Sequence, residues 1–160
     1  MEQPVGLFFV FVALAAVLFG LFASVAALFP RYVWLAQRAA EESPGRSFLL
    51  GAVNTAFVLA LSLAALGSQG PILTLLGGIV MAAGASGLAI GLSGVTTMVG
   101  KRLSPRASGS SGILTGTIVL ALASAAPFLG WFVFLPAIVF LGLGAFVLGW
   151  YRRRVWSDQV

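Results

Sequence analysis

The sequence predicts an all-helical integral membrane protein with five transmembrane helices. Hydrophobic residues make up 60% of the chain and charged residues only 8%, whereas about a quarter of the residues in soluble domains are charged. The 160 residues leave room for about five spans with short connections, so residues 1–160 are expected to form a single membrane domain. The uncharged run from Gly112 to Trp150 would be roughly 58 Å long as one helix, about twice the hydrocarbon thickness of a bilayer. We therefore expect it to fold back at Pro127 to Gly130, because proline interrupts a helix and glycine tolerates positive φ.

The composition also excludes most cofactor chemistry. The chain contains neither cysteine nor histidine, so thiolate-bound metals, disulfides and histidine ligands for haem or zinc are absent. We predict no cofactor, no metal site and no catalytic residue. We attribute the net charge of +5 to the orientation of the protein in the membrane rather than to nucleic-acid binding, because basic loops of membrane proteins remain in the cytoplasm.

The first span is expected at residues 5–29, with small residues near a four-residue spacing at Ala16, Gly20, Ser24 and Ala27. Pro30 ends it, and Tyr32 and Trp34 are typical of the headgroup level. Good helix formers follow from Ala36 to Glu42, and together with the two aromatic residues they predict a short interfacial helix. Within it, Arg38 is spaced to pair with Glu41 and Glu42. Ser43-Pro44-Gly45 is expected to stop this helix, and Ser47 to cap the next one.

The second span is predicted at residues 48–66 and contains Asn54, an amide well inside the apolar run. We expect this amide to form an interhelical hydrogen bond, or alternatively to contact a lipid or quinone headgroup. A tight turn at Gly67 to Gly70 leads to the third span, residues 71–99, with Pro71 in its first turn. Small residues on one helix face permit close packing, and the third span carries such a face at Gly77, Gly84, Gly87, Gly91 and Gly94.

A polar loop at residues 100–109 precedes the fourth span, residues 110–126, and the fifth span is expected at residues 131–150. Pro136 lies one turn into the fifth span, where it either bends the helix or belongs to the first turn.

Five spans place all nine basic residues on one side of the membrane, which by the positive-inside rule is the cytoplasm. The N-terminus is then outside, and the expected location is the inner (plasma) membrane. Four spans would leave the basic C-terminal end outside. Anionic lipid headgroups are expected partners of the basic side chains, in particular Arg31, Lys101, Arg102, Arg152, Arg153 and Arg154.

Four segments together resemble the bacterial membrane domains that accompany polymer-forming, bactofilin-like proteins. They are Phe29-Pro30-Arg31, the stretch from Pro44 to Gly51, the turn from Pro127 to Trp131, and Gly142 to Ala145. The resemblance implies a membrane-embedded helical domain that accompanies a β-helical cytoskeletal module. It brings no catalytic residue with it.

Three classes of function are compatible with this pattern. The first is a non-catalytic structural or accessory membrane protein, which packs through small-residue faces against other membrane subunits or copies of itself. The second is a small transporter or channel, although ion-coupled carriers normally place charged residues inside the membrane and these spans contain none. The third is a lipid enzyme that uses Glu41 and Glu42. The first is the prediction carried forward, with the transporter as its alternative.

Overall fold

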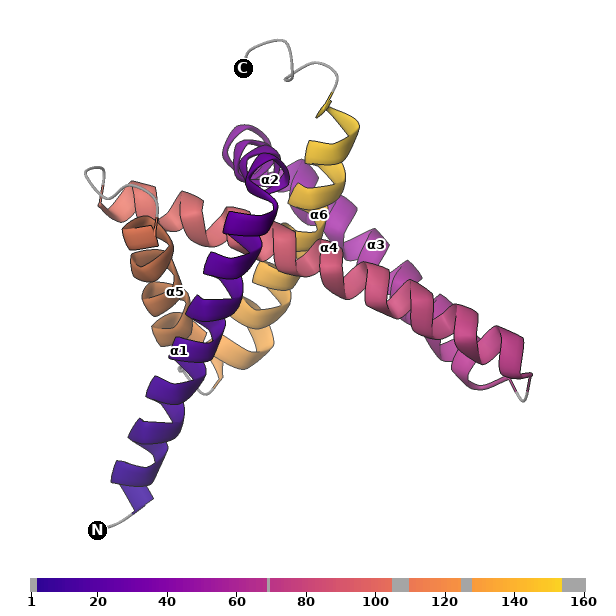
Figure 1. Cartoon of the computed structure of the whole chain (residues 1–160), viewed down its shortest axis with the longest axis horizontal. Coiled ribbons are helices and arrows are strands. Elements are labelled where there is room, and N and C mark those ends of the chain that lie inside the picture. Colours follow the sequence, from indigo (N-terminus) through magenta and orange to yellow (C-terminus); the bar gives the residue numbers. More distant parts are fainter. Residues whose placement is uncertain (1–2, 69, 105–109, 125–127, 154–160) are drawn as a thin grey trace.

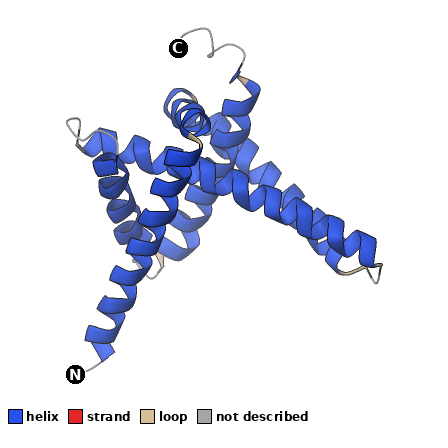
Figure 2. Ribbon diagram, viewed as in Figure 1, coloured by secondary structure: helices blue, strands red, loops and turns tan. Residues whose placement is uncertain are grey.

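A computed structural model of the chain describes residues 3–68, 70–104, 110–124 and 128–153. Every regular element in these ranges is a helix (Figure 2). The elements in chain order are α1 (Gln3–Leu28), α2 (Pro30–Glu42), α3 (Pro44–Leu66), α4 (Pro71–Leu103), α5 (Ser110–Ser124), the π-helix η1 (Gly130–Phe134) and α6 (Leu135–Tyr151). The predicted all-helical fold class is confirmed for the described ranges.

Three of the described helical segments are long and apolar enough to cross a membrane: α3, α4 and the segment Phe132–Tyr151, which comprises the end of η1 and α6. Helices α1 and α2 count as a fourth candidate if they form one broken span, since their axes bend by 109° at Phe29. Helix α5 has 15 residues, which is about 22 Å against roughly 30 Å of hydrocarbon. The structure therefore supports three or four spans by length, and the fifth depends on α5.

Helix α3 begins earlier than the sequence suggested, and the predicted role of Ser47 is wrong. Pro44 occupies the first turn of α3, and Ser43 is the residue before it. The Ser47 hydroxyl instead donates to the carbonyl oxygen of Ala39 on α2 at 3.2 Å and is fully buried. Proline fits a first helical turn because its missing N–H has no acceptor there. A single residue therefore joins α2 to α3.

Helix α4 begins at Pro71, as predicted, with Gly70 as its N-cap residue; Gln69 lies outside the described residues. It continues to Leu103, four residues past the expected end, so Lys101 and Arg102 belong to its last turn. Cations are favoured there by the helix dipole and the unpaired carbonyls. This explains why the basic residues extend the helix rather than ending it.

The turn predicted at Pro127 to Gly130 is only partly described, because Pro127 lies outside the described residues. Gly130 is the first residue of η1 and is helical, so its predicted place in the reversal is wrong. The N–H of Leu135 donates to the Gly130 carbonyl, five residues back. Pro136 has no N–H to offer, and its ring would clash with a carbonyl four residues back. We attribute the wider π-turn to this proline, which lies in the first turn of α6.

Helix α4 is the element that touches all the other α-helices (Figure 1). Helices α3 and α4 run antiparallel, and the half of the pair that contains the end of α3 and the start of α4 projects from the molecule as an arm. The other half packs on α6, and α2 crosses near the end of the molecule where α6 finishes. The buried core lies where α2 meets α4 and α6. Its members are Leu35, Ala36, Ala39 and Ala40 of α2, Val95 and Met98 of α4, and Ala145 and Leu148 of α6.

Candidate functional site

The glycine row predicted on the third span lies against helices of the same chain. A Cβ atom at any of these five positions would come within 3.0 Å of a neighbouring atom. The contacts are with three different helices: Gly77 and Gly84 face α3, Gly87 and Gly91 face α6, and Gly94 faces α2. The row is therefore covered by the chain itself, and it is not open to a second subunit.

The closest helix contacts involve glycines that the sequence analysis did not select. A Cβ at Gly51 would overlap the carbonyl oxygen of Phe140, and a Cβ at Gly144 would overlap that of Ser47. The same relation joins Gly100 to Gly112, where α4 and α5 meet. These glycines allow backbone-to-backbone contact between α3 and α6 and between α4 and α5. The spacing of glycines along the third span selected the row from Gly77 to Gly94, and it did not reveal these other contacts.

Asn54 makes a hydrogen bond within its own helix. Its side-chain nitrogen donates to the Leu50 carbonyl oxygen at 2.8 Å. The expected partner on another helix is replaced by this local one, which satisfies the amide at little cost inside an apolar segment. Two hydroxyls of the same helix, Thr55 and Ser62, are buried without a hydrogen-bond partner among the described residues.

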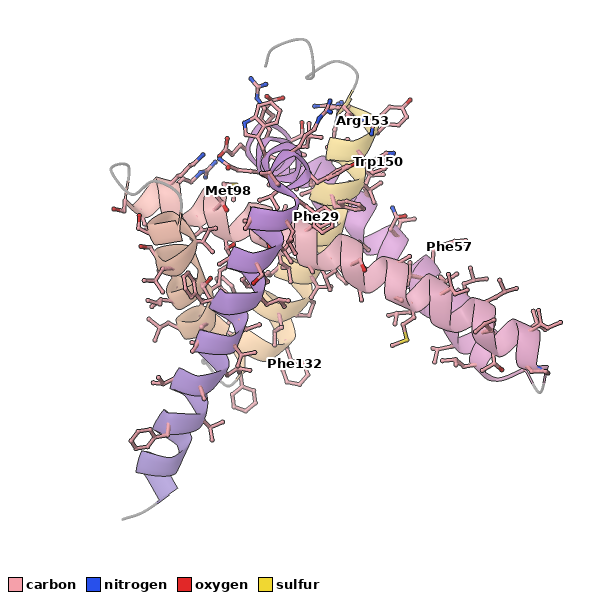
Figure 3. The ribbon with its side chains drawn as sticks, in the orientation of Figure 1. Phe29, Phe57, Met98, Phe132, Trp150 and Arg153 are labelled. Carbon is pink, nitrogen blue, oxygen red and sulfur yellow. The ribbon has the colours of Figure 1, made fainter. Side chains whose placement is uncertain are left out.

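The described basic residues lie at the end of the molecule formed by α2 and the neighbouring helix termini (Figure 3). Of the predicted headgroup ligands, Arg31, Lys101, Arg102 and Arg153 are exposed and Arg152 is half-buried. Arg154 lies outside the described residues. The arrangement gathers positive charge from α2, α3, α4 and α6 although these residues are far apart in sequence.

Both described carboxylates are engaged at this end. Glu42 pairs with Arg38 at 3.4 Å, as the i,i+4 spacing predicted, and with Arg152 of α6 at 4.0 Å. Glu41 instead accepts a hydrogen bond from the Gln37 amide at 2.7 Å. The two acids therefore tie α2 to itself and to α6, and neither forms an ion pair with Lys101 or Arg102 of α4.

Gln37 is a central residue of this polar network that the sequence analysis missed. Its side-chain oxygen accepts a hydrogen bond from Lys101 at 3.2 Å, while its nitrogen donates to Glu41. Only 7% of Gln37 is exposed. The signal was present, because Gln37 lies four residues after Val33 and three before Ala40, on the buried face of α2. A polar side chain on that face needs partners.

Aromatic rings surround the same end. Tyr32 stacks on Trp150 with ring centroids 5.5 Å apart, and the Arg153 guanidinium lies 5.2 Å from the Trp150 ring. A second guanidinium, that of Arg38, lies 5.0 Å from the Trp34 ring. Tyrosine and tryptophan prefer the headgroup level of a bilayer. The rings and cations together have the chemistry of a membrane interface.

An apolar groove runs between α1 and α5. Its volume is about 370 Å³, and it is lined by side chains from Val12 to Phe19 on α1 and from Leu114 to Leu122 on α5. Thr117 is the polar member of the lining, and its hydroxyl donates to the Ile113 carbonyl at 2.8 Å. The groove therefore offers hydrocarbon surface to whatever fills it.

The described residues contain no group of three acidic side chains that could hold a metal ion. No known protein family, curated protein or solved structure is significantly similar to the chain. The resemblance to membrane domains of bactofilin-like proteins stays a prediction. The features available for function are the basic aromatic end, the apolar groove and the exposed helix faces.

Proposed function

We propose that the chain is a non-catalytic structural or accessory protein of the cell membrane, in which five helices cross the bilayer with the N-terminus outside and the C-terminus in the cytoplasm. In this arrangement α2 lies at the cytoplasmic interface. The protein associates with other membrane subunits or with copies of itself. The observation that carries the proposal is the separation of charge from apolar surface: the described charged side chains gather at one end, and the helices below it expose hydrocarbon.

An extended exposed apolar surface belongs to the arm of α3 and α4. Val53, Phe57 and Ile72 are each more than 60% exposed, and the arm contacts the rest of the molecule only through its inner half. In a bilayer such a surface faces lipid or another protein. The arm therefore adds surface for contact with lipid or another protein to the surface that the packed helices provide.

A second surface is the row of small residues on α1. Ala16, Gly20, Ser24 and Ala27 are all exposed, and a Cβ at Gly20 would meet no atom within 4 Å. Since the glycine row of α4 is covered internally, α1 replaces it as the face through which close association with a neighbouring helix is proposed. The part of the row available for this runs from Gly20 to Ala27, because Ala16 lines the groove between α1 and α5.

The test is extraction of the protein from its native membrane in a gentle detergent through a C-terminal tag, followed by mass determination of the intact assembly. The proposal expects stoichiometric subunits or a homo-oligomer. Gly20→Leu should weaken the assembly, whereas Gly45→Leu should not, because Gly45 is equally open but belongs to the first turn of α3. A protein that migrates as a single chain in every mild detergent would contradict the proposal.

A small transporter or channel is the alternative, and the π-helix η1 favours it. Interrupted helices supply binding sites in many carriers, and π-turns often lie at functional positions. Substrate-dependent flux through proteoliposomes that is lost on changing Asn54 or Thr115 would support this alternative. The absence of flux for ions and small metabolites would leave the accessory role as the better account.

A further inference from the structure

We propose that the groove between α1 and α5 holds one acyl chain of an anionic phospholipid, and that Arg102, with Lys101 beside it, binds the headgroup phosphate. The inference deepens the proposed membrane role and rests on the basic end lying at the bilayer surface. It assigns the lipid to α1 and α5 and not to the glycine row of α4, which other helices cover.

One end of the groove lies near the end of α4, which carries the two cations. Helix α5 starts beside the end of α4, because Gly112 packs directly on Gly100 and Gly116 packs on Thr96 (Figure 1). Lys101 and Arg102 follow Gly100 immediately. The first groove residue of α5, Leu114, lies about 3 Å further along the helix axis than Gly112. A chain in the groove therefore has its polar end close to the end of α4.

The lining of the groove suits a hydrocarbon chain. It is apolar except for Thr117, whose hydroxyl already donates to the Ile113 carbonyl. The lining on α5 extends over about 12 Å along the helix axis. An extended acyl chain can lie along such a groove without leaving a polar group unpaired.

The positive charges of Lys101 and Arg102 favour a lipid with an anionic headgroup. Glu41 and Glu42 are engaged by Gln37, Arg38 and Arg152, and the partner of Lys101 is the neutral amide of Gln37. Arg102 is exposed beside it. A guanidinium forms paired hydrogen bonds with phosphate oxygens, and a neighbouring ammonium adds a point charge. A zwitterionic lipid would gain less from two adjacent cations than a lipid with net negative charge.

The test is native mass spectrometry of the protein released from vesicles that contain equal amounts of phosphatidylglycerol and phosphatidylcholine. We expect one retained phosphatidylglycerol per chain, in at least fivefold excess over phosphatidylcholine. Ala121→Phe fills the groove and should abolish retention. Arg102→Gln should keep a lipid in the groove while reducing the excess at least threefold.

Matched controls lie elsewhere on the molecule. Ala82→Phe adds the same ring to an open depression at the arm, and Arg46→Gln removes an exposed charge from α3; both should retain lipid as the unmodified chain does. If Ala121→Phe does not fold, Ala15→Leu narrows the groove from the side of α1 without changing the row of small residues proposed for assembly.

Equal retention of the two lipids by the unmodified chain would overturn the proposal, as would undiminished retention by a folded groove variant. Assembly is read separately, from the mass of the complex extracted from the native membrane. Failure of lipid binding is therefore distinguishable from failure of the proposed assembly.

Discussion

At the scale of single residues, glycines bring the backbones of neighbouring helices into direct contact. The seven-residue repeat of Gly77, Gly84 and Gly91 indicated a packing face, and the structure places that face against two different helices. A spacing along one helix cannot identify its partner. Gly51 and Gly144 were not selected as packing positions, because each contacts a carbonyl oxygen that is far away in sequence.

Replacing Gly51 or Gly144 with alanine should destabilise the protein by about 1–3 kcal/mol, because the added methyl overlaps a backbone carbonyl that cannot move alone. Gly78→Ala is the matched control, since Gly78 is helical with no atom within 4 Å of an added Cβ. Alanine there should be neutral or stabilising by up to about 1 kcal/mol. The measurement is the free energy of unfolding in mixed detergent micelles. Equal effects at Gly51 and Gly78 would contradict the packing described.

Gln37 is the residue whose removal should disturb the polar end most. Gln37→Leu leaves Glu41 and Lys101 without their shared amide, and we expect a loss of about 1–3 kcal/mol in the free energy of unfolding. Ser86→Ala is the control, because the exposed hydroxyl of Ser86 donates to the carbonyl oxygen of Ala82 in its own helix. A Gln37 variant as stable as the Ser86 variant would show that the bridge between α2 and α4 contributes nothing.

At the scale of helices, the sequence predicted all six α-helices in nearly their observed places. Uncharged runs determine where apolar helices can form, and prolines mark where they begin. The sequence did not determine how α2 packs. Tyr32, Trp34 and the helix-forming residues after them suggested an interfacial helix, and the apolar face of α2 lies against α4 and α6. A lipid-facing helix and a protein-facing helix share the same pattern, because both bury one apolar stripe.

A larger side chain on that face distinguishes the two arrangements. Ala39 is fully buried, so Ala39→Leu should destabilise the protein by about 1–3 kcal/mol through overpacking. Ala60→Leu on the exposed side of α3 is the control and should have little effect. If α2 instead rested on lipid, leucine at position 39 would be tolerated as well as at position 60. Thermal unfolding in detergent gives the comparison.

At the scale of the whole molecule, the composition predicted a membrane protein and the basic residues predicted a common side. The described helices bring those basic residues together although they come from four segments of the chain. The number of spans is less determined, because α5 is about 8 Å shorter than the hydrocarbon layer. Length alone therefore does not decide whether α5 crosses. Whether α5 crosses determines on which side of the membrane the C-terminal cations lie.

Cysteines introduced one at a time can report the number of crossings, because the chain itself contains no cysteine that would react with the label. Ser43→Cys and Ser104→Cys mark the basic end, while Ser68→Cys and Phe128→Cys mark the links on the other side of α3 and of α5. With a membrane-impermeant maleimide on intact cells, five spans predict labelling at positions 68 and 128, and labelling at 43 and 104 only after permeabilisation. Protection of position 128 together with position 104 in intact cells would mean that α5 does not cross, and would contradict the five-span topology.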